Sequence, residues 1–386
     1  MSTVYAITGA VIFDGENWHE NAALVVEHGT VKSIEATSVL TADIRRVEMN
    51  GGKLVPGFID VQVNGGGGVL LNDGPSIDAI RTICDAHFAF GTTALLPTLI
   101  TDTPETTAAA IAASKAAAQE KVAGFIGLHL EGPHLSVSHK GTHDPKLIRP
   151  MDDADLIAII EAVQEIPVLL TTVAPETVSP EKIKAMVDAG VIVSLGHSGA
   201  SYETALAAQA AGASMVTHLF NAMSQLGHRS PGVVGATLQS GELSAGLIAD
   251  GFHVDKASMS IALRAKQGPA KIFLVTDAMS TIGTDITSFT LNGRTITRAG
   301  GRLTLEDGTL AGADLDMISA VRFVHQQLGL TLDESLRMAS LYPAQSIHID
   351  HTHGRLLPGY EANIVHLTEN LDVDHVWIGG DLHYAR

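Results

Sequence analysis

The chain has 386 residues, 45% of them hydrophobic and 17% charged, a balance typical of a folded globular protein rather than a disordered one. Its 24 basic and 42 acidic residues give a net charge of −18, which repels nucleic-acid phosphates and anionic membrane surfaces. We therefore expect neither nucleic acid nor a membrane as a partner. The sequence has no recognisable secretory signal or membrane-spanning run, and a single cysteine, Cys84, so we expect a cytoplasmic protein.

The two ends of the chain have a similar pattern. Residues 1–56 are predicted to form short β-strands separated by turn signals such as Asp14-Gly15, and residues 357–386 have the same texture. We therefore predict that both ends combine into one small β-sandwich domain.

The long segment 57–356 has a different pattern, in which apolar strands alternate with alanine-rich helices. The strand candidates are 58–63, 93–98, 124–131, 168–174, 191–197, 214–220, 244–250 and 271–277. Eight β/α units predict an α/β fold of the closed (β/α)8, TIM-like barrel type. A β-hairpin insertion is predicted near 288–310, after the eighth strand.

Polar residues stand at the predicted carboxyl ends of these strands, where barrels of this kind place their active sites. They are Gln62, Asn64, Thr98, Glu131, His197, His218, Asp250 and Asp277. Each buried polar group left without a partner costs about 1–3 kcal/mol, so packing alone does not explain such a set.

A metal ion would satisfy three of these residues together. Glu131, His197 and His218 offer one carboxylate and two imidazoles, a set that suits one divalent cation with a position left for water. Zinc is the first expectation, with Fe²⁺, Mn²⁺ and Co²⁺ as alternatives. Water bound there can ionise near neutral pH and attack a carbonyl, and Asp277 is placed to act as the general base.

Several motifs resemble those of a known family. They are LVPGFIDVQVNGGGG at 54–68, LPTLIT at 96–101, GLHLEGPHL at 127–135, KGTH at 140–143, VSLGHSGAS at 193–201, THLFNAM at 217–223, ADGFHVD at 249–255 and LVTDAM at 274–279. The residues of these motifs and their order along the chain resemble those of the N-acetylglucosamine-6-phosphate deacetylases, which belong to the amidohydrolase superfamily. This resemblance implies hydrolysis of the substrate acetamide to glucosamine 6-phosphate and acetate, in amino-sugar catabolism or cell-wall recycling.

The resemblance also implies roles for single residues. Glu131, His197 and His218 match the metal ligands of the family, Asp277 its catalytic acid and base, and His143 a residue beside the acetamido carbonyl. The remaining matches concern the sugar phosphate: Asn221 and Ala222 approach it, while Arg229 and His253 bind it across a homodimer interface.

One position departs from the superfamily pattern. Many amidohydrolases carry a His-x-His pair on strand one that binds a second metal, whereas this chain has Gln62 and Asn64. Neutral amides are weak ligands for zinc beside imidazole, so we expect a vestigial second position and one metal ion per chain.

Two other functions are kept as alternatives. Gly196 to Ala200 imitates a nucleophile elbow, with Ser198 as the nucleophile of a serine hydrolase and Asp277 and His351 following in the order of a catalytic triad. The chain could also be a sugar-phosphate binder without catalytic activity. Labelling by a fluorophosphonate and release of acetate distinguish these alternatives.

Overall fold

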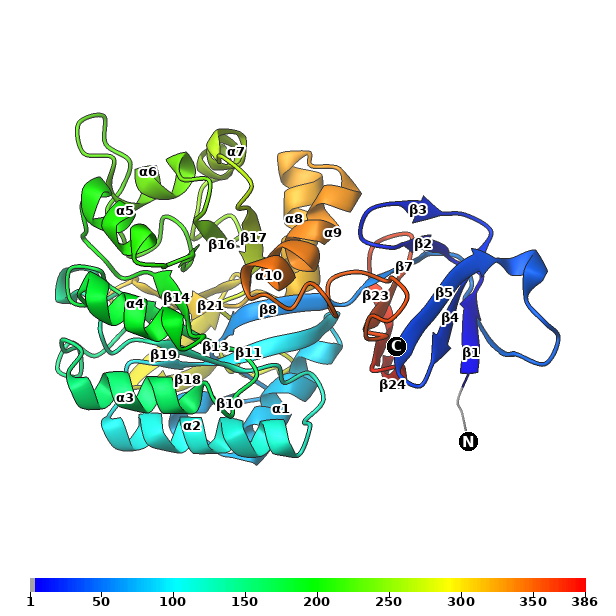
Figure 1. The fold of residues 1–386 in the computed structure, drawn as a ribbon, viewed down its shortest axis with the longest axis horizontal. Helices are drawn as coiled ribbons and strands as arrows, with labels where there is room; N and C mark the ends of the chain where they lie inside the picture. The colour runs from blue at the N-terminus through cyan, green and yellow to red at the C-terminus, as the bar shows by residue number, and fades with distance from the viewer. Residues whose placement is uncertain (1–3) are drawn as a thin grey trace.

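An eight-stranded parallel sheet forms the centre of the larger part of the molecule in the computed structural model, which describes residues 4–386 (Figure 1). The strands follow one another around the sheet in chain order: β8 (Phe58–Val63), β11 (Thr92–Ile100), β12 (Leu128–Glu131), β13 (Leu169–Val173), β14 (Ile192–Leu195), β15 (Met215–Val216), β16 (Ser244–Ile248) and β17 (Ile272–Val275). A parallel bridge between Val63 and Ala278 joins the last strand to the first. The predicted (β/α)8 barrel class is confirmed.

Helices cover the outside of this barrel. They are α1 (Ile77–Phe88), α2 (Pro104–Gln119), α3 (Asp153–Ala162), α4 (Pro180–Asp188), α5 (Tyr202–Ala210), α6 (Gly232–Gln239), α7 (Lys256–Ala265), α8 (Met317–Leu328), α9 (Leu332–Ala339) and α10 (Leu341–Ser346). The hydroxyls of Thr103 and Ser179 accept hydrogen bonds from the first turns of α2 and α4, where proline follows each cap. None of the helices in residues 4–386 is long and apolar enough to cross a membrane.

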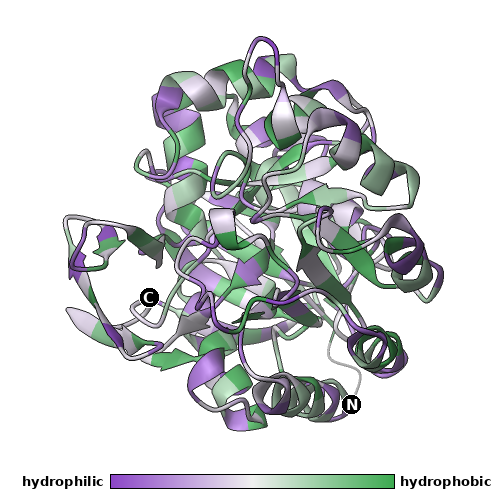
Figure 2. Cartoon of the chain, turned by 90° about the vertical axis from the view of Figure 1, so that its left-hand side faces the viewer, coloured by the Kyte–Doolittle hydropathy of each residue, from purple (hydrophilic) through white to green (hydrophobic). Residues whose placement is uncertain are grey.

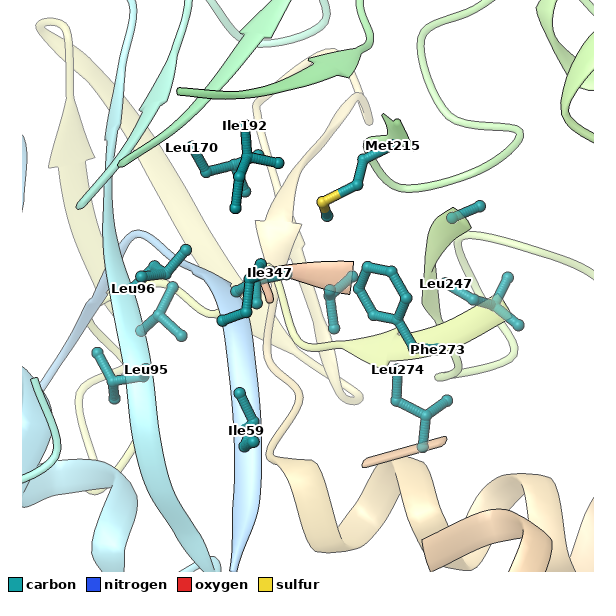
Figure 3. Packing of buried hydrophobic residues seen from close by; sticks show 14 of the residues in the cluster. Ile59, Leu95, Leu96, Leu170, Ile192, Met215, Leu247, Phe273, Leu274 and Ile347 are labelled. Atoms are coloured by element: carbon teal, nitrogen blue, oxygen red, sulfur yellow. The ribbon is translucent and has the colours of Figure 1, made fainter. Parts of the chain in front are cut away.

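The inward faces of the barrel strands carry mainly apolar side chains, beside a small buried network in which His129, Thr172, Thr217 and Ser194 are hydrogen-bonded. Figure 3 shows Leu170, Ile192, Met215 and Phe273, from four different strands, pointing into the space between the strands. Figure 2 shows hydrophobic colour concentrated on the central strands and mixed on the surrounding helices. This arrangement buries the strands on both faces, as their continuous apolar runs predict.

Both chain ends build the smaller part of the molecule, on the right of Figure 1. One sheet has the order β5 (Thr30–Ala36), β4 (Ala22–Glu27), β1 (Val4–Thr8) and β6 (Arg45–Glu48). The other has the order β24 (Asp381–Ala385), β23 (Val373–Ile378), β22 (Ile364–Leu367), β7 (Lys53–Pro56), β2 (Val11–Phe13) and β3 (Trp18–His19). We propose two domains, a small one made of residues 1–56 and 357–386 and the barrel of residues 57–356. Residues 1–3 lie outside the described residues.

The predicted hairpin near 288–310 is part of a larger insertion. It is a four-stranded antiparallel sheet of β18 (Ser288–Leu291), β19 (Arg294–Ala299), β20 (Arg302–Thr304) and β21 (Leu310–Ala313). Four strands form because the sheet has its own small core, in which Leu291, Ile296 and Leu303 are buried. The backbone N–H of Ala313 donates to the carbonyl of Asp277 at 2.9 Å, which holds this sheet against the carboxyl end of β17.

Short elements complete the chain. They are β9 (Gly65–Gly66), β10 (Val69–Leu70), and the 3-10 turns Thr37–Val39, Leu71–Asp73 and Val137–His139. The strands β9 and β10 pair with each other, so the glycine-rich run after β8 forms a tight antiparallel turn.

Candidate active site

Three side chains from separate strands meet at one point in the barrel mouth. The Oε1 atom of Glu131 lies 3.1 Å from Nε2 of His197 and 3.0 Å from Nε2 of His218, and the two Nε2 atoms are 3.0 Å apart. All three side chains are buried. The structure therefore brings together the three residues that the sequence predicts as metal ligands.

The chemistry of these atoms fits a divalent cation. Nδ1 of His197 lies 2.9 Å from the carbonyl oxygen of His139, which only accepts, so Nδ1 carries the proton and Nε2 presents a lone pair. Two nitrogen atoms and a carboxylate oxygen at such short range repel one another unless a positive charge lies between them. In a tetrahedral zinc site with bonds of about 2.0 Å, two ligand atoms are about 3.3 Å apart. The separations of these three atoms are close to that distance.

Glu131 stays ionised in this position. Burial by itself raises the pKa of its carboxyl group, but the neighbouring imidazoles of His197 and His218 hold that pKa well below the usual value. An anionic ligand is therefore available at neutral pH.

His143 lies beside the three ligands, with its ring centroid 4.3 Å from that of His197. Glu131, His143 and His197 each offer a ligand atom within 4.8 Å of the others, so distance alone also allows His143 as a ligand. However, Nδ1 of His143 accepts the backbone N–H of Thr101 at 3.3 Å, which leaves the proton on Nε2. Burial, with His197 nearby, keeps the pKa of His143 well below its usual value, so the neutral ring is a donor through Nε2–H.

Asp277 is held by the two amides of strand β8. Its Oδ1 atom accepts from Nδ2 of Asn64 at 2.7 Å and from Nε2 of Gln62 at 3.2 Å, and the same Nε2 lies 3.2 Å from Oε1 of Glu131. The amide group of Gln62 thus donates to both carboxylates, Glu131 and Asp277. It occupies the place at which a bridging cation could neutralise them. Burial, and then the charge of Glu131, raise the pKa of Asp277 to about 6.

Left-handed backbone turns carry three of these side chains into the mouth. The sequence predicts strands up to His197, up to Asp277 and through His218, but β14, β15 and β17 each end two residues before the functional residue. His197, His218 and Asp277 have φ values of 46°, 31° and 52°. Such a conformation costs a non-glycine residue about 1–3 kcal/mol and is typical of functional sites.

A cavity of about 250 Å³ opens above these residues. Its lining includes Asn64, Glu131, His143, His197, His218, Asn221, Ala222, His253, Asp277, Thr309, Leu310 and Gly312. Asn221, Ala222 and His253 therefore line the cavity of their own chain, although the resemblance implies that His253 reaches the phosphate across a dimer interface. Thr309, Leu310 and Gly312 were missed, because they follow strand eight by more than thirty residues and belong to the insertion sheet.

Two polar residues at the strand ends, Asp250 and Thr98, form hydrogen bonds with neighbouring residues and do not line the cavity. Oδ2 of Asp250 lies 2.6 Å from Nδ1 of His253, which orients that ring and leaves its Nε2 atom free for a ligand. The hydroxyl of Thr98 accepts the backbone N–H of Val63 at 2.9 Å, a contact that ties β11 to β8.

Arg229 is not at this cavity. It is exposed in the loop between β15 and α6 and does not line the cavity of its own chain. Within one chain the structure therefore separates Arg229 from the other predicted substrate contacts.

Asp60 is a fully buried carboxyl group below the site, and its replacement tests how burial affects stability. It accepts hydrogen bonds from the Thr276 hydroxyl and from the backbone N–H of Gln62. Burial raises its pKa from 3.8 to about 7. The folded state thus keeps a proton that the unfolded state releases near pH 4, so this contribution to stability is lost as the pH rises from about 4 to about 7.

Asp60→Asn has no proton to lose, so its free energy of unfolding should fall less steeply over this range, by up to about 1.4 kcal/mol per pH unit. Urea unfolding at pH 5, 6 and 7.5 measures the slope. The exposed Asp188→Asn is the control, and equal slopes in the wild type and Asp60→Asn would contradict the assignment.

Together, the barrel and the carboxylate and imidazole groups at its mouth are characteristic of a metal-dependent hydrolase. The chain belongs to the amidohydrolase family, whose model matches residues 54–382, and residues 4–54 match the NagA composite domain. This family is metal-dependent.

Relatives and solved structures resemble the chain over nearly its whole length. The N-acetylgalactosamine-6-phosphate deacetylase of Shewanella sp. (strain ANA-3) is 43% identical, with 97% of this chain and 95% of the relative covered. The N-acetylglucosamine-6-phosphate deacetylase of Haemophilus influenzae is 33% identical, with 97% and 98% covered. The structure of N-acetylglucosamine-6-phosphate deacetylase from Pasteurella multocida has a TM-score of 0.95 at 35% identity, with 99% and 100% covered.

One solved structure contains a sugar phosphate. A mutant of N-acetyl-D-glucosamine-6-phosphate deacetylase from Mycobacterium smegmatis, in complex with N-acetyl-D-glucosamine-6-phosphate, has a TM-score of 0.91 at 28% identity, with 99% and 100% covered.

Proposed function

We propose that this chain hydrolyses the acetamide of N-acetylglucosamine 6-phosphate to glucosamine 6-phosphate and acetate. The observation that carries this proposal is the meeting of Glu131, His197 and His218 within 3.1 Å, beside Asp277 and His143, in one cavity. Relatives with this activity match the chain over nearly its whole length. The reaction belongs to amino-sugar catabolism or cell-wall recycling. We propose a cytoplasmic location because the single thiol, Cys84, is buried and unpaired.

Glu131, His197 and His218 would hold one divalent cation per chain in this proposal, with zinc first and Fe²⁺, Mn²⁺ or Co²⁺ as alternatives. A cation bound there would supply Lewis acidity, which polarises the amide carbonyl and lowers the pKa of a water molecule. Gln62 and Asn64 take the place of a second metal, because their amides already donate to the neighbouring carboxylates.

Asp277 moves the proton in this mechanism. Its Oδ1 atom is engaged by Gln62 and Asn64, so Oδ2 is the atom that takes a proton from water and returns it to the departing amine nitrogen. His143 donates through Nε2–H to the carbonyl oxygen, on which negative charge builds during the attack.

The phosphate requires local positive charge in a chain of net charge −18. His253, oriented by Asp250, lies at the cavity, with Asn221 and Ala222 beside it. Arg229 is exposed and does not line the cavity of its own chain, so we propose a homodimer in which Arg229 serves the neighbouring site, while His253 binds the phosphate in the cavity that it lines. An arginine fork matches a phosphate group in geometry and charge.

Arg229→Ala should raise KM for the phosphorylated sugar about tenfold or more while kcat changes little, because a charge-assisted hydrogen bond contributes about 1.5–3 kcal/mol. Steady-state kinetics of acetate release measure both constants. Arg264→Ala, an exposed arginine on α7, is the matched control and should leave KM unchanged. An unchanged KM in Arg229→Ala would contradict the phosphate role.

Acetate release from four sugars tests the function itself. N-acetylglucosamine and N-acetylgalactosamine are each supplied with and without a 6-phosphate, because the relatives carry both sugar names. We expect turnover of N-acetylglucosamine 6-phosphate and much poorer turnover of the two sugars without phosphate. Binding without acetate release from the zinc-loaded protein would indicate the non-catalytic binder.

The serine hydrolase alternative requires a histidine, His351, as the partner of the Ser198 hydroxyl, and the structure shows other partners. Its hydroxyl donates to Oε2 of Glu176 at 2.6 Å and accepts from the backbone N–H of Ala200 at 3.0 Å. Both contacts shape the loop after β14. Labelling of Ser198 by a fluorophosphonate, with activity that survives chelation, would favour this alternative.

A further inference from the structure

A second group of potential metal ligands lies outside the barrel, in the sheet made by the chain ends. His366 on β22 and His375 on β23 are directly opposite each other in an antiparallel pair. The Nδ1 atoms of His366 and His375 lie 2.9 and 2.8 Å from the same oxygen, Oδ2 of Asp374. These three ligand atoms all lie within 4.8 Å of one another.

The ring of His366 has a polar contact at each of its two nitrogen atoms. Its side chain is buried, and its Nε2 atom lies 2.8 Å from the carbonyl oxygen of Gly51, which only accepts, so Nε2 carries a proton. Nδ1 then faces a carboxylate oxygen at 2.9 Å. Nδ1 can therefore offer its lone pair to a cation held between this ring and Oδ2 of Asp374.

A metal ion between these three ligand atoms would contact both imidazoles and the carboxylate at once. With a cation present, His366 remains neutral and its Nε2–H group donates to a backbone carbonyl, an arrangement typical of metal-bound histidine. The ring also lies close to the backbone of Gly52, where a Cβ atom would be only 2.7 Å from Nε2 of His366.

The other two ligands are within reach of solvent. The side chains of His375 and Asp374 are 27% and 30% exposed, and the His375 ring stacks on Trp377 at 5.5 Å and 13°. An ion at this position could therefore exchange with solvent, and water molecules could complete its coordination.

We propose that His366, Asp374 and His375 form a second metal site, which binds a divalent transition ion of the zinc class. Two imidazoles and one carboxylate are the ligand types that such ions prefer. The ion ties the β22–β23 pair to the Gly51–Gly52 turn, directly before the strand β7 that leads into the barrel. Its role is structural, because none of the three residues lines the catalytic cavity.

Metal counting in full-length variants tests this site. Each protein is stripped with a chelator, reloaded with Zn²⁺, separated from free ion by gel filtration and analysed for zinc. The wild type should hold two ions per chain, the one proposed for the barrel mouth and a further one at this site; His375→Gln should hold one, Glu131→Gln one, and the double variant none. His383→Gln, which changes an exposed histidine on β24, is the matched control and should bind as the wild type does.

Cobalt loading gives a readout that does not depend on activity. Glu131→Gln loaded with Co²⁺ should show the visible absorption of a nitrogen-ligated ion, and adding His375→Gln should abolish it. The site is refuted if Glu131→Gln binds no Zn²⁺, or if His375→Gln binds as many ions as the wild type. Asp374→Asn should also remove the second metal ion. If Asp374→Asn does not fold, the result for His375→Gln decides the test.

Discussion

Asp277→Asn should lower kcat by about 10³-fold, within the range of 10²–10⁴ that a general acid–base group contributes. The asparagine amide keeps the size of the side chain and can rotate to accept the hydrogen bonds of Gln62 and Asn64, but it cannot take a proton from water. Without that proton the amine is a poor leaving group. Kinetics of acetate release with N-acetylglucosamine 6-phosphate measure the effect.

The metal content of Asp277→Asn should stay near that of the wild type, because Asp277 is not among the three atoms that meet at the cation site. Asp285→Asn, an exposed aspartate in the segment after β17, is the control and should retain full activity. Turnover of Asp277→Asn at the wild-type rate would remove Asp277 from the mechanism.

Glu131→Gln should abolish detectable turnover and remove one metal ion per chain. Glu131 is the only anion among the three proposed ligands, and its Oε1 atom is in contact with both imidazoles. A glutamine in its place leaves two neutral imidazoles and a neutral amide, a set that holds a divalent cation weakly. Zinc analysis and the acetate assay on the same sample measure both effects.

The exposed Glu203→Gln on α5 serves as the control for Glu131→Gln and should keep both metal and activity. If Glu131→Gln retained full activity after chelation, the proposed centre would be wrong. Loss of activity with metal fully retained at the barrel site would instead place Glu131 outside the ligand set.

The local pattern of the sequence was sufficient to predict the barrel and the approximate position of its site. Apolar runs bounded by cap and turn residues mark each strand, and parallel strands of a barrel meet at their carboxyl ends. Glu131, His197, His218 and Asp277 follow such runs, so their meeting was predictable without knowledge of any contact between them.

Other features depend on contacts between distant parts of the chain. The insertion sheet brings Leu310 and Gly312 to the cavity, and Asp250 turns to His253 instead of to a ligand. Gln62 also lies between two carboxylates that follow it by 69 and 215 positions. No local pattern reports such pairings, because each depends on how a side chain is oriented once the barrel has closed.

The sequence by itself therefore determined the order of strands and helices and the residue types at the strand ends, since periodicity and capping act over a few neighbouring residues. Only the tertiary structure decided which atoms face one another, as at His197, where a left-handed turn and the carbonyl of His139 direct Nε2 toward Glu131. The same holds for His366 and His375, whose common contact with Asp374 arises from the register of β22 and β23. Hydrogen-bond geometry and strand register become fixed when the packed fold satisfies its buried polar groups.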